Sequence, residues 1–108
     1  MASPASALRV AEIVRELQGI LERLEGSTGD ERLKVYADCP PLLNEVKALI
    51  LPPFPVKEVK SLTHEASWHL RSLAGLTAVN CSQDDEHAKW AKESLGALAR
   101  CAAQQQAG

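Results

Sequence analysis

Apolar residues near the start of the chain recur at alternating intervals of four and three residues. The positions that carry this pattern are Val10, Val14, Leu17, Leu21 and Leu24. Such spacing places them along one side of an α-helix, and Ile13 and Ile20 widen that side. Charged residues occupy the opposite side, and Gly26 follows as a natural helix end. The pattern therefore predicts an amphipathic helix over about residues 7–25.

The next apolar segment is divided by the pair Pro40-Pro41. The residue before a proline avoids the α conformation, so a helix should break or kink near Cys39. Because proline is accepted in a first helical turn, a new helix can begin at the same place. The sequence predicts a short helix over about 30–37 and a longer one over about 41–51, together a proline-kinked second helix.

Two further amphipathic segments follow the proline-rich segment 52–55. The first covers about residues 56–79, and its inward positions are Val59, Leu62, Ala66, His69 or Leu70, Leu73 and Leu76. After a turn at 80–82, the second runs to about residue 104. Its inner face is mostly alanine, which lets a neighbouring helix approach closely.

These segments predict an all-α fold, a single domain over residues 1–108 with 1–6 and 105–108 frayed. Four helices with short connections are typical of an antiparallel up-and-down four-helix bundle. Short armadillo- or HEAT-like helical hairpins are the alternative, which the segment ESLGALARCA (93–102) resembles. A solenoid generally needs three or more repeats, so the bundle is favoured.

Composition and charge narrow the classes of function. Hydrophobic residues make up 45% of the 108 positions and aromatic residues only 4%, so the core should be aliphatic. The net charge is -2, with 12 basic residues interspersed among 14 acidic ones. Because no basic stripe is present, we expect binding to neither nucleic acid nor membrane surfaces.

Neither a secretory signal nor a membrane-spanning run is recognisable in the sequence. We therefore expect a cytoplasmic or nuclear protein that is not secreted. Cys39, Cys81 and Cys101 are odd in number and far apart, and in a reducing compartment they should be free thiols.

His64, Glu65 and His69 resemble the zinc-protease signature H-E-x-x-H. That motif needs histidines four residues apart, about 40° around a helix, whereas five residues give about 140°. We therefore expect no metal and no cofactor. A small cysteine- and histidine-dependent enzyme remains an alternative, but no oxyanion hole, phosphate loop or carboxylate pair marks one.

The segment PPFPVK places Pro52, Pro55 and Lys57 in the pattern P-x-x-P-x-[KR], which SH3 domains bind in the polyproline II conformation. The alternative interpretation is a plain connection, because prolines both end and begin helices.

Trp68, Leu70 and Trp90 are candidates for a partner-binding surface. Trp68 and Leu70 flank the apolar stripe of the third segment on opposite sides, so that helix is apolar on more than one side. Exposed aromatic residues are enriched at binding hot spots, although tryptophans at the edge of a core are common. We therefore predict a non-enzymatic interaction module or adaptor that binds another protein, or a second copy of itself, through an apolar helical surface.

The segment LILPPF (49–54) resembles six residues of the Hsp70-binding BAG domains. This resemblance implies an Hsp70-type co-chaperone as an alternative function. The charged pattern of the binding helices of that family is absent from this chain.

Overall fold

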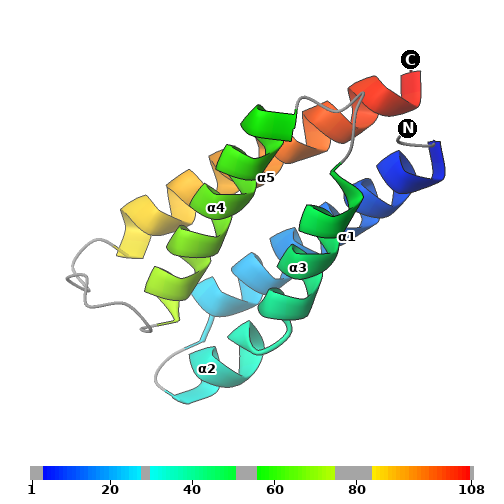
Figure 1. Ribbon diagram of the computed structural model, residues 1–108. Helices are drawn as coiled ribbons and strands as arrows, with labels where there is room; N and C mark the ends of the chain where they lie inside the picture. The colour runs from blue at the N-terminus through cyan, green and yellow to red at the C-terminus, as the bar shows by residue number, and fades with distance from the viewer. Residues whose placement is uncertain (1–3, 28–29, 51–55, 75–83, 108) are drawn as a thin grey trace.

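A computed structural model describes residues 4–27, 30–50, 56–74 and 84–107 of the chain. Its helices are α1 (Pro4–Glu25), α2 (Asp30–Tyr36), α3 (Cys39–Leu49), α4 (Val56–Leu73) and α5 (Asp84–Ala107). The four longer helices run in alternating directions and pack against one another, while α2 is a short connecting helix (Figure 1). No β-strand occurs within these ranges. The predicted all-α helical bundle is confirmed.

The first helix ends as its sequence suggests. The backbone N–H of Gly26 donates to the carbonyl of Glu22 at 3.2 Å, and the Ser27 hydroxyl donates to the carbonyl of Arg23 at 2.6 Å. These bonds satisfy carbonyls that the last turn of a helix leaves without a partner. At the other end α1 begins at Pro4, and α5 continues to Ala107, so both helices extend into ends that were expected to be frayed.

The proline pair separates two helices rather than kinking one. α2 ends at Tyr36 and α3 begins at Cys39, two residues before the predicted start, with Pro40 in its first turn. The missing N–H of Pro40 costs nothing there, because the first N–H groups of a helix have no acceptor within it. Asp38 is the N-cap residue, and its side chain makes no capping hydrogen bond.

α4 is shorter than the sequence predicted. It ends at Leu73 instead of Val79, and a turn at Ala74 follows, with the Ala74 N–H bonded to the Leu70 carbonyl at 3.1 Å. Gly75 comes next in the sequence, a residue suited to the end of a helix. The turn predicted at 80–82 lies outside the described residues.

α5 has the most extensive contacts, with α4 on one side and α1 on the other, whereas α3 is packed more sparsely. The core between them is aliphatic. Its largest side chains with under 2% exposure are Val10, Ile13, Val14, Leu17, Leu21, Leu24, Val46, Val59, Leu70, Leu95 and Leu98, together with Thr63. Within the described helices, no segment combines the length and apolar character that crossing a membrane requires.

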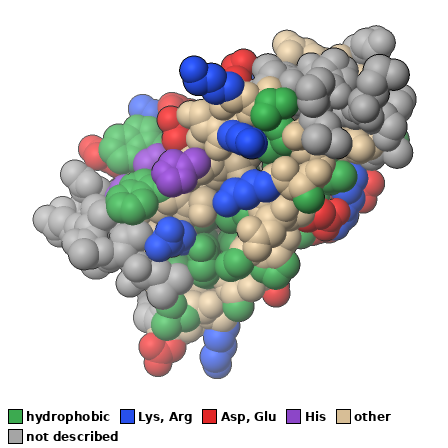
Figure 2. All heavy atoms as spheres, viewed as in Figure 1, with side chains coloured by type: hydrophobic (Ala, Val, Ile, Leu, Met, Phe, Trp, Pro, Cys, Tyr) green, Lys and Arg blue, Asp and Glu red, His purple; other side chains and the backbone are tan. Residues whose placement is uncertain are grey.

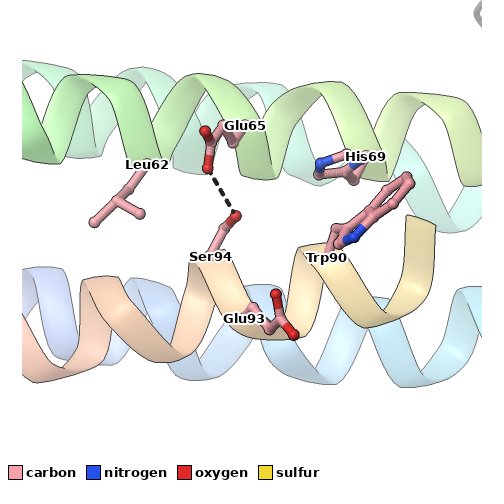
Figure 3. Close-up of a pocket in the computed structure, with 6 residues that line it drawn as sticks. All are labelled: Leu62, Glu65, His69, Trp90, Glu93 and Ser94. Carbon is pink, nitrogen blue, oxygen red and sulfur yellow. Dashed lines mark hydrogen bonds between the residues drawn. The ribbon is translucent and has the colours of Figure 1, made fainter. Parts of the chain in front are cut away.

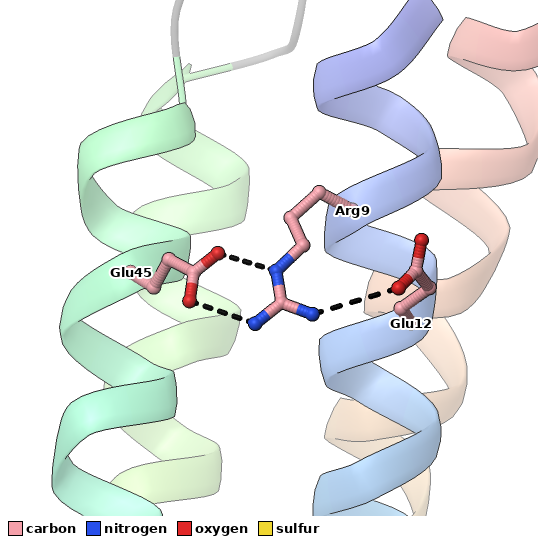
Figure 4. A network of polar contacts seen from close by, with 3 residues as sticks. All are labelled: Arg9, Glu12 and Glu45. Carbon is pink, nitrogen blue, oxygen red and sulfur yellow. Dashed lines mark hydrogen bonds and ion pairs between the residues drawn. The ribbon is translucent and has the colours of Figure 1, made fainter.

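Polar contacts attach the sparsely packed helices to the rest. Arg9 on α1 forms a two-point ion pair with Glu45 on α3, in which Nη2 lies 2.8 Å from Oε1 and Nε contacts Oε2 (Figure 4). Arg9 also pairs with Glu12 at 3.5 Å. On α2, Arg32 donates to the carbonyls of Ser27 at 2.7 Å and Leu73 at 3.0 Å. A cation is favourable at these helix ends, because the carbonyl dipoles point toward it.

Candidate functional site

The candidate site is a groove on the surface between α4 and α5. A hollow of about 440 Å³ lies between the two helices (Figure 3). α4 contributes Leu62, Glu65 and His69 to its lining, and α5 contributes Trp90, Glu93 and Ser94. We call this feature the α4–α5 groove.

A second hollow adjoins the first along α4. Its volume is about 520 Å³, and it shares Leu62 and Glu65 with the first hollow. The rest of its lining is Val56, Lys57, Glu58 and Ser61. The two hollows thus adjoin at Leu62 and Glu65, and together they extend from the first turn of α4 to Trp90 on α5. The name α4–α5 groove is used for both.

A pair of histidines joins the two helices at one end of this groove. The Nδ1 atoms of His69 and His87 lie 2.9 Å apart, which is hydrogen-bond distance. One Nδ1 must therefore donate and the other accept. His87 is only 4% exposed, and its Nε2 atom is buried without a partner among the described residues.

Trp90 covers the histidine pair. Its ring is tilted against His69 with centroids 5.2 Å apart, and it meets His87 edge-on at 5.5 Å. The side chain is still 37% exposed, so part of the indole faces solvent on the groove wall. A large apolar surface is thus held in place by ring contacts but left accessible, as at aromatic hot spots of interfaces.

Trp68 lies near the same groove on α4, although it lines neither hollow. It is 41% exposed, and it follows the groove-lining Glu65 by three residues, a spacing that makes side chains neighbours on a helix surface. Near the end where α4 stops and α5 begins, Figure 2 shows histidine and large hydrophobic side chains next to one another on the surface. Trp68 and Trp90 are thus both exposed near the groove, and their role in a binding face stays a prediction.

The surroundings of His69 favour its neutral form. Burial lowers the pKa of His69, the proximity of His87 lowers it further, and the Glu65 carboxylate opposes both effects. A lowered pKa keeps the imidazole uncharged at neutral pH. The groove therefore owes its charge to its carboxylates and to Lys57.

The groove contains a serine, a histidine and a glutamate, yet their contacts do not match a catalytic triad. Such a triad needs the serine bonded to the histidine and the histidine bonded to the acid. Here the Ser94 hydroxyl contacts the Glu65 carboxylate at 3.5 Å, and Nδ1 of His69 is engaged with His87. The arrangement does not activate Ser94 as a nucleophile.

Leu70 does not belong to a partner-binding surface. It is 0% exposed, because it follows Ala66 by four residues and precedes Leu73 by three, which directs all three side chains into the core. Leu70 rather than His69 thus takes the inward position, and the prediction of Leu70 as a contact residue is wrong.

The proline-rich motif is only partly described. Pro52 and Pro55 lie outside the described residues, while Lys57 is exposed on the first turn of α4 and lines the second hollow. The interpretation of PPFPVK as an SH3 ligand stays a prediction.

The cysteines are poorly suited to nucleophilic chemistry. Burial raises the pKa of the Cys39 thiol to about 12, and it also raises the pKa of Cys101. Both are free thiols with little exposed surface, and Cys81 lies outside the described residues. Among the residues that the structure describes, no three histidine, cysteine or acidic side chains are grouped closely enough to hold a metal ion.

Sequence reasoning missed the partnership of His69 with His87. The two residues are 18 positions apart, and their meeting depends on how α4 and α5 are aligned. One signal was present: His87 precedes Ala91 by four residues and Leu95 by eight, a spacing that places it on the inward side of α5.

A separate depression, away from the α4–α5 groove, lies between α1 and α3. It measures about 640 Å³ and is lined by Glu16, Gly19, Ile20, Arg23, Asp38, Pro41 and Leu42. A Cβ added at Gly19 would meet nothing within 4 Å, so the depression is open there. It lacks the exposed aromatic side chains of the α4–α5 groove.

Comparisons of the chain with protein families, with curated proteins and with solved structures give no match.

Proposed function

We propose that this protein is a non-enzymatic interaction module that binds another protein through the α4–α5 groove. The observation that carries the proposal is the position of Trp90, which forms the groove wall with 37% of its surface exposed. Monomeric proteins usually cover large aromatic side chains, and an exposed one beside a depression is typical of an interaction site.

The shape of the groove supports a macromolecular ligand. Its two hollows of about 440 and 520 Å³ adjoin one another along α4. Small-molecule sites are usually enclosed pockets that bury most of the ligand, whereas this depression is open along its length. An open and mainly apolar depression that follows α4, with α5 as a second wall at one end, fits a segment of another chain.

The chemistry of the groove and of the two described cysteines also favours binding over catalysis. The Ser94 hydroxyl contacts Glu65 rather than a histidine, and the raised thiol pKa values of Cys39 and Cys101 disfavour the thiolate that a cysteine nucleophile needs. His69 and His87 are occupied with each other.

Affinity capture with matched variants tests the proposal. The full chain would be used as bait in cell lysate beside Trp90→Ala, Trp68→Ala and the control Leu33→Ala, with bound proteins identified by mass spectrometry. Leu33 is 43% exposed on α2, away from the groove, so it matches the tryptophans in exposure alone. Circular dichroism would show whether each variant is folded.

The expected result is a partner protein that binds the wild type and Leu33→Ala but is lost from both folded tryptophan variants. Sedimentation of the purified chain would show whether that partner is a second copy. Partners that bind all four baits equally would overturn the proposal.

A further inference from the structure

Four residues of α4 form a stripe along the groove with a regular chemical order. Glu58, Leu62, Glu65 and His69 follow one another at intervals of four, three and four residues, which places them on one side of the helix. All four line the two hollows of the groove. Along the groove, an acidic side chain is therefore followed by an apolar one, a second acidic one and an aromatic ring.

Among the described residues, ion pairs neutralise some carboxylates of the molecule but none of those in the groove. Glu45 and Glu12 pair with Arg9, and Glu25 pairs with Lys92 at 3.0 Å. Glu58, Glu65 and Glu93 form no ion pair with a lysine or arginine in the part of the chain that the structure describes.

The groove is thus negative as well as apolar. Among the lining residues that the structure describes, three carboxylates, those of Glu58, Glu65 and Glu93, stand against one lysine, Lys57. The lowered pKa of His69 keeps that residue from compensating them at neutral pH. An occupant that buries the apolar lining must desolvate these carboxylates, which is costly unless it brings cations to them.

We infer that the partner inserts an amphipathic helix that carries two lysine or arginine side chains seven residues apart, with a large apolar side chain between them. This inference rests on the proposed function and specifies the occupant of the same groove. Glu58 and Glu65 are seven residues apart on α4, a separation of about 10 Å along the axis. Basic residues with the same separation on an aligned helix reach both carboxylates, and the apolar side chain between them faces Leu62.

A helix fits this place better than an extended strand. α4 and α5 are antiparallel neighbours (Figure 1), and a third helix packed along their outer groove repeats the packing of the bundle itself. Neither wall offers an open strand edge, because both are helices whose backbone groups are bonded internally. Helix-in-groove binding relies on side-chain anchors, and Trp90, Leu62 and Trp68 supply the apolar surface for them.

Selection from a displayed library of helical peptides tests this inference with the intact chain as bait. The library would be randomised at all surface positions, and binders would be kept when they bind wild type but not Trp90→Ala or Trp68→Ala. We expect them to be enriched in lysine or arginine at a spacing of seven. Trp90 lines the groove and is partly exposed, so tryptophan fluorescence gives a direct titration.

Matched charge variants sharpen the test. Glu58→Gln and Glu65→Gln should each weaken the selected peptides about two- to fivefold, as partly exposed ion pairs do, and the loss should shrink in high salt. Glu22→Gln, an exposed glutamate of α1 outside the groove, should leave the affinity unchanged.

The outcomes separate the two proposals. Tryptophan-dependent binders that are acidic or uncharged would overturn the inferred chemistry and leave the proposed binding groove in place. A lysate partner that depends on Trp90, with no helical peptide selected, would overturn the helical occupant. If neither the captured lysate proteins nor the selected peptides depend on the tryptophans, the proposed function itself is overturned.

Discussion

His69 and His87 hold their Nδ1 atoms 2.9 Å apart across the interface of α4 and α5. Only one proton fits between two nitrogens at this distance, so one ring donates and the other accepts. Protonation of both rings would put two N–H groups against each other in a place where His87 is 4% exposed. The folded arrangement therefore tolerates one imidazolium at most, whereas the unfolded chain tolerates two.

We predict that the protein loses stability as the pH falls below about 6.5. Well above that pH the imidazole of His69 is neutral in both the folded and the unfolded state, so it contributes no pH dependence. Below that pH the unfolded chain takes up protons that His69, with its lowered pKa, resists, so the free energy of unfolding decreases with falling pH. Urea denaturation followed by circular dichroism between pH 7.5 and 5 measures this slope.

A variant pair isolates the contribution of the histidine contact. His69→Asn keeps a polar atom near the position of Nδ1 but removes the titrating ring, so its slope between pH 7 and 5 should be smaller than that of the wild type. His64→Asn removes an exposed histidine from the same helix and serves as control. Equal slopes in the wild type and His69→Asn would show that the pair does not govern the acid response.

The Arg9–Glu45 pair should govern part of the response at lower pH. The Arg9 guanidinium bonds to the Glu45 carboxylate and holds its pKa below the usual value. A lowered carboxyl pKa stabilises the fold above about pH 4.5, and this contribution is lost as the pH falls through the folded-state value. A double-mutant cycle with Arg9→Gln and Glu45→Gln should give a favourable coupling at pH 7 that declines as the pH falls below about 4.5 and weakens in high salt.

The buried apolar side of α1 should be essential to the fold. Leu17 is 0% exposed, so Leu17→Ala should lower the free energy of unfolding by roughly 2 to 5 kcal/mol. Glu16→Ala, at the next and exposed position, should change it by less than about 0.5 kcal/mol. Urea midpoints of the two variants give the comparison, and equal midpoints would mean that Leu17 is not a core residue in solution.

Periodicity predicted α1 and the bundle because the apolar residues that recur along one side of that helix all face the core. Val10, Leu17 and Leu24 recur with the helical period and are all buried, so the sequence alone identifies the side that faces the core. The end of α4 was less visible, because residues after Leu73 continue the apolar pattern although the helix ends there. The α2–α3 break was located to within two residues by its prolines.

The candidate site was predictable only where it depends on one helix. The exposure of Trp68 follows from its place beside the apolar stripe of α4, and it was predicted. The contact of His69 with His87 and the adjoining hollows depend on the axial alignment of α4 against α5, which no local pattern encodes. Leu70 was misplaced because a stripe drawn through His69 is also compatible with the spacing of its neighbours.

Trp68 and Leu70 are two residues apart on α4 and lie in opposite environments. Trp68 is 41% exposed near the groove, and Leu70 is 0% exposed in the core. A helix turns through about 200° over two residues, so a residue beside the groove and a core residue alternate over this distance. Truncation of each side chain should therefore affect a different property of the protein.

We predict that Trp68→Ala leaves the domain folded and weakens association with its partner by about 2 kcal/mol or more, as removal of an aromatic hot spot does. Leu70→Ala should lower the free energy of unfolding by roughly 2 to 5 kcal/mol, because it leaves a cavity among buried leucines. Thermal melts of both variants, and titration of the captured partner against Trp68→Ala, separate the two effects. If Trp68→Ala destabilises the fold as much as Leu70→Ala, Trp68 is a core residue, and the binding face must then rest on Trp90 alone.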